Sequence, residues 1–294
     1  MTRVAAAVDP VVLERILRWA KGIEDFEEHH AHDGVFLGSA FRHDGLPENA
    51  DADFLVGLCV TFWFWFDDRS DRFRCDADTY DTLIALGSDP SHRTTKRAPE
   101  IAFFERLGDE VKQRCGSAAE HAWWLMGSAI VFRGMLAERV MSRAGAAPSY
   151  AEALEAGADS STLPSILPAA NVAHRMDRAA RASDQRLARA ERYMCLSQRL
   201  LNDLVSADKE RREGHAGRVS NIALLLEGSM SRGAARAFVE AQLHGYERLM
   251  SHELDLLGPG DDFARLIRHS IRNIRRWYAL GPARYGSGAE GGAA

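Results

Sequence analysis

The chain has few cysteines, no long hydrophobic run and no large excess of either charge. Its 294 residues include 4 cysteines, Cys59, Cys75, Cys115 and Cys195, and none of them forms a CxxC pair. This scatter argues against a disulfide framework or a zinc site and favours reduced thiols in a cytoplasm. The 37 basic and 42 acidic side chains leave a net charge of −5, so no global attraction draws the chain to nucleic acid.

Signals that would direct the chain to a membrane are also missing from the sequence pattern. The most apolar run, FLVGLCVTFWFWF at residues 54–66, is too short to span a bilayer and is typical of a buried core helix. The first residues, MTRVAAAVDPVVLER, reach charge and proline before any long apolar run, which argues against a signal peptide. We therefore expect a cytoplasmic protein with no membrane partner.

Strand signals are weak, whereas helical periodicity recurs along the chain. Besides the apolar run, which Asp51 or Asp53 could cap, helices are expected around residues 76–86, 99–115, 118–143, 169–181, 184–210, 231–256 and 262–278. Glycine, serine and proline between Gly157 and Pro164 predict a break near the middle of the chain. No change of composition marks a linker, so we predict one all-α domain over residues 1–285 and a disordered glycine-rich tail over residues 286–294.

Three carboxylates follow the apolar run directly, in the sequence DDRSD. On a helix Asp67 and Asp71 lie about 40° apart, and Asp68 lies about 100° from Asp67. Carboxylates this close repel one another unless a cation joins them, and oxygen ligands favour Mg²⁺. A solvated helix end is the alternative, but the uncharged run places these acids where a buried helix emerges. Trp63 and Phe64 lie one turn earlier on the face of Asp67, where they could pack in the core or line a cavity.

A second group of oxygen ligands lies in the sequence NDLVSADKE. Asn202, Ser206 and Glu210 recur every four residues and therefore share one side of a helix. An amide, a hydroxyl and a carboxylate offer a hard-cation site of low charge. Lys209 returns to nearly the face of Asn202, and a lysine beside a metal indicates a shared anion such as a phosphate. The alternative is a polar helix face, which the presence of two such motifs in one chain disfavours.

These two motifs, in this order and 135 residues apart, resemble the aspartate-rich DDxxD motif and the NSE motif of bacterial class I terpene synthases. Arg284 and Tyr285 match the RY pair near the C-terminus of that family. The phrases WAKGIEDF, SYAEALEAGADS and RLLNDLVSADKE are most similar to bacterial diterpene synthases of the ent-kaurene synthase type. The resemblance covers almost the whole chain and implies a helical bundle around a central apolar active-site cavity.

The resemblance also implies a role for individual residues. Asp67, Asp68 and Asp71 would hold two Mg²⁺ ions, and Asn202, Ser206 and Glu210 would hold a third. Of these, Asp67, Asp71, Asn202, Ser206 and Glu210 are the implied catalytic residues. Lys209, Arg284 and Tyr285 would contact the substrate diphosphate. Trp63, Phe64, Asp159, Ser160 and Trp277 would line the cavity.

The implied activity is that of a Mg²⁺-dependent enzyme that ionises a prenyl diphosphate, cyclises the carbocation and releases diphosphate. One departure bears on the substrate. Many bacterial members carry a diphosphate-sensing arginine where this chain has Ala156, and enzymes of the ent-kaurene synthase type lack it there. This favours a C20 substrate, geranylgeranyl diphosphate or a copalyl-type diphosphate. The alternatives are a sesquiterpene synthase acting on farnesyl diphosphate and a non-catalytic helical binding protein, which Ala156 alone supports.

The remaining motifs, and those that are missing, limit which reactions and sites the sequence predicts. The chain has no DxDD and no second DDxxD, which argues against protonation-initiated cyclisation and against chain elongation. A bicyclic substrate would therefore come from an upstream class II cyclase. The sequence does not decide whether the chain forms a homodimer. The histidine-rich run of His29, His30, His32 and Asp33 is interpreted as a solvated loop. The arginine series at residues 265–276 is interpreted as a solvated helix face, and the Asp261 and Asp262 pair as the cap of the last helix.

Overall fold

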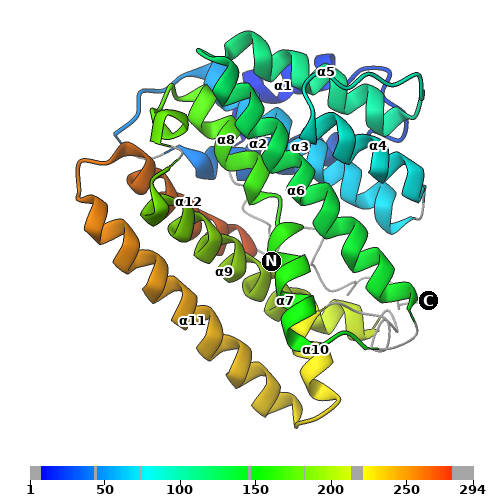
Figure 1. The fold of residues 1–294 in the computed structure, drawn as a ribbon, viewed down its shortest axis with the longest axis vertical. Helices are drawn as coiled ribbons and strands as arrows, with labels where there is room; N and C mark the ends of the chain where they lie inside the picture. The colour runs from blue at the N-terminus through cyan, green and yellow to red at the C-terminus, as the bar shows by residue number, and fades with distance from the viewer. Residues whose placement is uncertain are drawn as a thin grey trace, which may run out of the picture.

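The computed structural model describes residues 8–42, 45–72, 74–144, 147–181, 183–212 and 221–279, with all their side chains except those of residues 179 and 180. Within these ranges the chain forms α-helices and short 3₁₀ helices without a β-strand, which confirms the predicted all-α class (Figure 1). The elements are α1 (Pro10–Trp19), α2 (Glu28–Gly38), η1 (Ser39–Phe41), α3 (Ala50–Asp71), α4 (Ala77–Ser88), α5 (Pro99–Arg114), α6 (Ala118–Arg143), α7 (Tyr150–Asp159), α8 (Leu163–Ala173), η2 (Arg178–Arg181), α9 (Gln185–Arg212), α10 (Ile222–Glu227), α11 (Arg232–Leu257) and α12 (Asp262–Ala279). The predicted domain end and the glycine-rich tail lie outside the described residues.

Helix α3 runs through the core, as its composition predicts. Its residues from 54 to 63 are all buried, because the helix is apolar on every side rather than along one stripe. Asn49 starts the helix: its side-chain oxygen accepts from the N–H groups of Asp51 and Ala52 at 3.0 and 3.2 Å. The expectation that Asp51 or Asp53 caps this helix is wrong, because the helix already begins at Ala50. Both aspartates lie in its first turn, where a negative charge meets the positive end of the helix dipole.

The predicted break in the middle of the chain is confirmed, since α7 and α8 are separate helices. Thr162 between them has a left-handed φ of 66°, and Pro164 lies in the first turn of α8, where its missing N–H costs no hydrogen bond. The helix expected over residues 169–181 begins earlier, at Leu163, and also ends earlier. Helix α8 ends at Ala173, and Arg175, with φ 54°, turns the chain before η2.

Close helix crossings bring distant parts of the chain together. Helix α2 packs along α3, and α9 packs along α11 (Figure 1). Glycine permits two of the closest approaches. A Cβ at Gly34 of α2 would lie 2.0 Å from Thr61 Oγ1 of α3, and one at Gly127 of α6 would lie 1.9 Å from the Pro164 carbonyl oxygen of α8. Helix α8 contacts both α3 and α6, and α7 contacts both α6 and α9, so these helices hold one another in place.

Helix α12 carries the arginine series on its outer face, as the sequence predicts. Asp261 caps the helix by accepting a backbone N–H bond of 2.8 Å. Arg268 and Arg275 donate to Asp255 and Glu247 of α11 at 2.8 and 2.7 Å. The opposite face of α12 is apolar and buried, which seats the helix on the bundle.

The four cysteines are free thiols, and three of them are buried. Burial raises the pKa of Cys195 to about 12, so this thiol stays protonated. Among the described helices, none combines the length and the apolar character that crossing a lipid bilayer requires.

Candidate functional site

A cavity of about 170 Å³ lies between α3, α6, α7, α9 and α12. Six of its wall residues are among those proposed from the sequence: Trp63, Phe64, Asp67, Ser160, Asn202 and Trp277. The Asp67 carboxylate from α3 and the Asn202 amide from α9 thus meet at one cavity, although 135 residues separate them in the chain. The two motifs contribute to the same site because α3 and α9 face one another across it.

Aromatic rings form one side of the cavity. Phe64 and Trp277 stack with ring centroids 5.8 Å apart, and Trp277 meets Tyr278 edge-on at 4.8 Å. Tyr278 Oη accepts hydrogen bonds from Gln198 Nε2 and Asn202 Nδ2, each at 3.0 Å. The buried Gln198 Oε1 has no hydrogen-bond partner within the described ranges. Since an unsatisfied buried oxygen costs free energy, this wall is suited to a ligand or water that brings a hydrogen-bond donor.

The three aspartates of the DDRSD motif have different surroundings. Asp67 lines the cavity, Asp68 is half-buried and contacts α2, and Asp71 is exposed at the last residue of α3. An arginine inside the motif fixes this end of the helix. Arg69 is buried, and its Nε donates to Glu100 Oε1 of α5 at 2.6 Å. The end of α3, and the carboxylates on it, therefore keep a defined place beside the cavity.

The interpretation of the histidine-rich run as a solvated loop is wrong, because the run is part of α2. His30 is 1 % exposed, and its Nε2 lies 3.2 Å from Asp68 Oδ2, with His29 Nε2 at 3.5 Å from the same oxygen. His30 Nδ1 lies 3.0 Å from the Glu27 backbone nitrogen and 3.1 Å from the Glu27 carbonyl oxygen, which fixes the ring with Nε2 facing Asp68. The contact with His30 orients the carboxylate of Asp68, and the possible ligand atoms of His29, His30 and Asp68 lie within 4.8 Å of one another.

The residues of the NSE motif follow α9 away from the cavity. Asn202 lines the cavity, and further along the helix the Ser206 hydroxyl donates to Glu210 Oε1. Asn221, which lies outside the motif, donates from its side-chain amide to Ser206 Oγ and Glu210 Oε1, each at 3.1 Å. Lys209 is half-buried on the same helix. The motif therefore presents amide, hydroxyl and carboxylate oxygens along one helix, and a second segment holds two of them.

One arginine in the cavity wall, Arg199, was not foreseen from the sequence. It lies one turn before Asn202 on α9 and is 8 % exposed. Its Nε donates to Asp203 Oδ2 at 3.0 Å, and its Nη1 donates to Glu138 of α6. Burial alone would lower the pKa of this guanidinium, but the carboxylates of Asp203 and Glu138 hold its pKa above the ordinary value. Burial raises the pKa of Asp203 to about 7, against the opposing effect of Arg199.

Some residues proposed from the sequence do not line the cavity, and others lie outside the described residues. Asp159 is not among the wall residues of the cavity, because its carboxylate is paired with Arg192 Nη1 at 2.6 Å. Its neighbour Ser160 does line the wall. Arg284 and Tyr285 lie outside the described residues.

Comparison with known proteins relates this site to one family. The model of terpene synthase family 2, C-terminal metal binding, matches residues 59–248, more than half of the chain. The chain belongs to this terpene synthase family. No curated protein matches it. The match includes the DDRSD motif, the NSE motif and the helix break between them, so a terpene synthase, a diphosphate-releasing lyase, is the enzyme class of this protein.

Solved structures establish the class I terpene synthase fold. The 2-methylisoborneol synthase from Streptomyces coelicolor A3(2) matches with a TM-score of 0.78 and 16% identity, over 95% of this chain and 93% of that one. The linalool/nerolidol synthase from Streptomyces clavuligerus, in complex with 2-fluorogeranyl diphosphate, matches with 0.76 and 20%, over 97% and 99%. A structure of the first enzyme in complex with Mg²⁺ and geranyl-S-thiolodiphosphate matches with 0.76 and 16%, over 97% and 96%.

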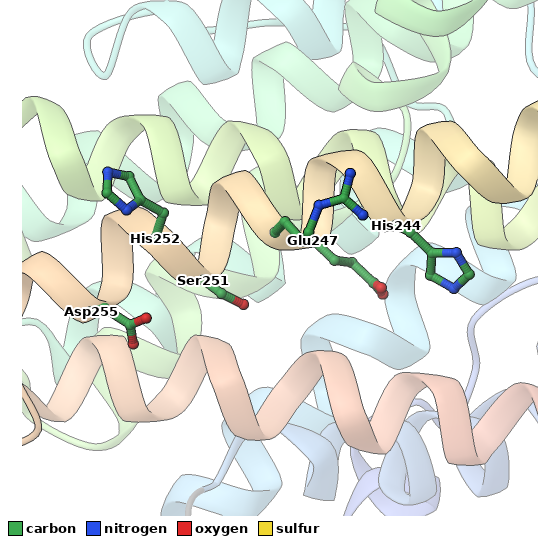
Figure 2. Close-up of a pocket in the computed structure, with 6 residues that line it drawn as sticks. His244, Glu247, Ser251, His252 and Asp255 are labelled. Carbon is green, nitrogen blue, oxygen red and sulfur yellow. The ribbon is translucent and has the colours of Figure 1, made fainter.

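The terpene synthase has a larger hollow at its surface, a groove of about 440 Å³ along α11. Figure 2 shows His244, Glu247, Ser251, His252 and Asp255 along this helix, next to α12. The groove is open and polar, and it contains none of the residues proposed for the site. Glu247 and Asp255 are engaged by arginines of α12, so the groove is explained as the polar seam between two helices.

Sequence reasoning missed five residues that hold or line the terpene synthase site, and three of them had a local signal in the sequence. Arg199 and Asp203 lie four residues apart, which predicts an ion pair along a helix. Asn221 precedes the apolar run IALLL, which predicts a helix cap, and it does cap α10. The contacts of Glu138 and Tyr278 with α9 are tertiary and leave no trace in local sequence.

Proposed function

We propose that this terpene synthase uses Mg²⁺ to ionise a prenyl diphosphate and cyclises the resulting carbocation inside the cavity, with release of diphosphate. The observation that carries the proposal is that Asp67 and Asn202 line the same cavity. The rings of Phe64 and Trp277 line that cavity as well. The reaction needs a polar end for metal and diphosphate and an apolar, aromatic end for the hydrocarbon, and this cavity has both.

The donor atoms suit Mg²⁺, since both motifs offer only oxygen. Asp67, Asp68 and Asp71 would hold two ions, and Asn202, Ser206 and Glu210 would hold a third. When bound, Mg²⁺ neutralises the charge that develops on the departing diphosphate. Because the Asp68 carboxylate is already in contact with His30 Nε2 at 3.2 Å, Asp67 and Asp71 are the main ligands on α3 in this proposal.

Basic side chains would hold the diphosphate itself. Lys209, Arg284 and Tyr285 are assigned this role by their match to the family motifs. We add Arg199, the cation among the described wall residues, because its planar guanidinium suits phosphate oxygens. Its place also supports this role: a Cβ at Gly157 would lie 2.4 Å from Arg199 Nε, and Gly157 directly follows Ala156. Arg199 would thus do from α9 what the arginine of many bacterial members does from the position of Ala156.

The aromatic rings would stabilise the carbocation. Trp63, Phe64 and Trp277 line the cavity, and a desolvated cation over the face of such a ring gains about 2 kcal/mol. The two carboxylates of the described wall, Asp67 and Glu138, are assigned to Mg²⁺ and to Arg199, so diphosphate or water would take the last proton.

For the substrate we propose a C20 diphosphate, either geranylgeranyl diphosphate or a copalyl-type diphosphate from an upstream class II cyclase. The likeness of three sequence phrases to the ent-kaurene synthase type and the alanine at position 156 support this choice. Farnesyl diphosphate is the alternative, and the solved relatives in complex with analogues of geranyl diphosphate add the C10 substrate to the test.

The test of the function is a product assay. Purified protein with Mg²⁺ is given C10, C15, C20 and copalyl-type diphosphates, and hydrocarbon extracts are analysed by mass spectrometry. A cyclic C20 product is expected. Product from the C15 substrate alone would contradict the diterpene assignment, and absence of product from every substrate would favour a non-catalytic binding protein. Light scattering of the same sample measures whether the protein is a homodimer.

The metal ligands are tested by truncation. Asp67→Ala and Asn202→Ala are each expected to lower kcat by roughly 10²–10³-fold or more, because each removes a group that stabilises developing charge. Helical circular dichroism should stay at the native level, and Asp255→Ala in the surface groove serves as the control with native kcat. Native turnover in Asp67→Ala would mean that the metal ligands are misassigned.

A further inference from the structure

Asn221 lies outside both motifs, yet its side chain holds part of the second one. It stands directly before α10 and is 1 % exposed. Its amide nitrogen donates to Ser206 Oγ, to Glu210 Oε1 and to the backbone carbonyl of Asp203, each at 3.1 Å. Because the amide has two hydrogens, one of them is shared between two acceptors.

The oxygen of the Asn221 side chain makes a different contact. Asn221 Oδ1 accepts from the Leu224 N–H at 3.2 Å and thereby caps α10. The neighbouring backbone N–H of Ile222 donates to Asp203 Oδ2 at 3.0 Å. The start of α10 is therefore docked on the face of α9 that carries the NSE motif, and the buried Asn221 amide is the part of it that reaches the motif oxygens.

We propose that Asn221 is a positioning residue that fixes Ser206 and Glu210 in the orientation in which they share one divalent cation. This inference rests on the proposed function. A serine hydroxyl rotates freely unless its partners fix it. Here the Ser206 hydroxyl donates to Glu210 while its oxygen accepts from Asn221, which leaves one lone pair of that oxygen for a cation. Asn221 also donates to Glu210, so it holds both ligand oxygens on one side of α9.

The cap and the positioning role use different atoms, so substitutions can separate them. Asn221→Ser keeps a side-chain oxygen that can cap α10 and removes the amide donors. Asn221→Ala removes both. Asn49 offers a matched control, since it caps α3 through the N–H groups of Asp51 and Ala52.

The test measures binding of Mn²⁺ to the full chain in the presence of inorganic diphosphate. Electron paramagnetic resonance monitors the binding, and no substrate is turned over. For one class of bound Mn²⁺, Asn221→Ser and Asn221→Ala should raise the dissociation constant by equal factors, roughly 10- to 100-fold, as loss of a ligand-orienting contact commonly does. Asn49→Ser should leave it unchanged. In a background that carries Ser206→Ala and Glu210→Gln, Asn221→Ser should add no further loss, because its route to the metal is already removed.

The outcomes distinguish this inference from the function it rests on. Equal Mn²⁺ affinity of the native chain and Asn221→Ser overturns the inference alone, and so does weaker binding in Asn221→Ala only, because the cap would then explain it. Absence of Mn²⁺ binding to the native chain overturns the proposed function as well.

A measurement on the native protein serves if these variants fail to fold. The side-chain amide resonances of Asn221 should shift when Mg²⁺ and diphosphate are added, while those of Asn49 stay in place. Unshifted Asn221 resonances overturn the inference.

Discussion

Arg199 shows how a single side chain can serve both fold and chemistry. A guanidinium that is 8 % exposed needs compensation, and Asp203 and Glu138 supply it from α9 and α6. The same residue lies in the cavity wall beside Asn202. A cation held in place by two carboxylates needs little rearrangement to meet an anionic substrate, which is the condition for effective electrostatic stabilisation.

Replacement of Arg199 by lysine tests this role, because it keeps the charge and removes the planar fork. We expect Arg199→Lys to lower kcat/KM roughly 10- to 100-fold, the worth of one hydrogen bond to a charged group. The affinity for inorganic diphosphate with Mg²⁺ should fall by a similar factor. Steady-state kinetics and titration calorimetry measure the two effects.

Arg192→Lys is the matched control for this substitution. Arg192 lies on the same helix and donates to Asp159 and Glu155 instead of lining the cavity. Its replacement should leave kcat/KM at the native level. If Arg199→Lys had native kinetics and native diphosphate affinity, Arg199 would be only an ion-pair partner within the fold.

At the scale of the helices, the crossing of α6 and α8 fixes the segment that borders the cavity. Gly127 of α6 lies against the backbone of α8 at Pro164, directly after the break whose residues 160–162 line the wall. A methyl group at this place would meet the Pro164 carbonyl oxygen at 1.9 Å, so the backbone of one helix would have to shift. The position of the break therefore depends on this glycine.

We predict that Gly127→Ala destabilises the protein by about 1–3 kcal/mol or more, because overpacking forces two helices apart. Thermal unfolding measures the loss. The product mixture should change as well, since α8 and the break would shift relative to α3. Native stability in Gly127→Ala would contradict the observed close approach of the two helices.

Gly245 on α11 is the matched control for this test. A Cβ there meets no atom within 4 Å, so Gly245→Ala adds a methyl group to an open helix surface. This substitution should stabilise the protein by about 0.5–1 kcal/mol, because alanine loses less backbone entropy than glycine in a helix.

Helices and their ends differ in how far sequence alone can predict them. The apolar run that forms α3 and the break at Thr162 could be predicted, since each follows from local composition. The burial of His30 could not, because it depends on α2 packing against α3. The cap of α3 was misplaced for a subtler reason: Asn49 and Asp51 are both good caps, and only the point where the helix starts decides between them.

At the scale of the molecule, the sequence indicated which residues belong together but not the walls around them. Asp67 and Asn202 could be paired because each lies in a spaced motif of oxygen ligands. Glu138, Gly157 and Tyr278 carry no such pattern, and they join the site only because α6, α7 and α12 fold against α3 and α9. The cavity is thus a property of the whole bundle, and a ligand that fills it should report on the stability of the whole bundle.

We therefore predict that Mg²⁺ with inorganic diphosphate stabilises the native chain against heat, whereas either one alone has a smaller effect. A ligand at 100 times its dissociation constant adds about 2.7 kcal/mol, which corresponds to a rise in Tm of about 4–5 °C for a chain of 294 residues. Chelation of Mg²⁺ should reverse the rise. Asp67→Asn should abolish it, because α3 then lacks its cavity carboxylate, while Asp255→Asn in the groove of Figure 2 should retain it. Loss of the rise in Asp255→Asn instead would move the diphosphate site from the cavity between α3 and α9 to the surface groove on α11.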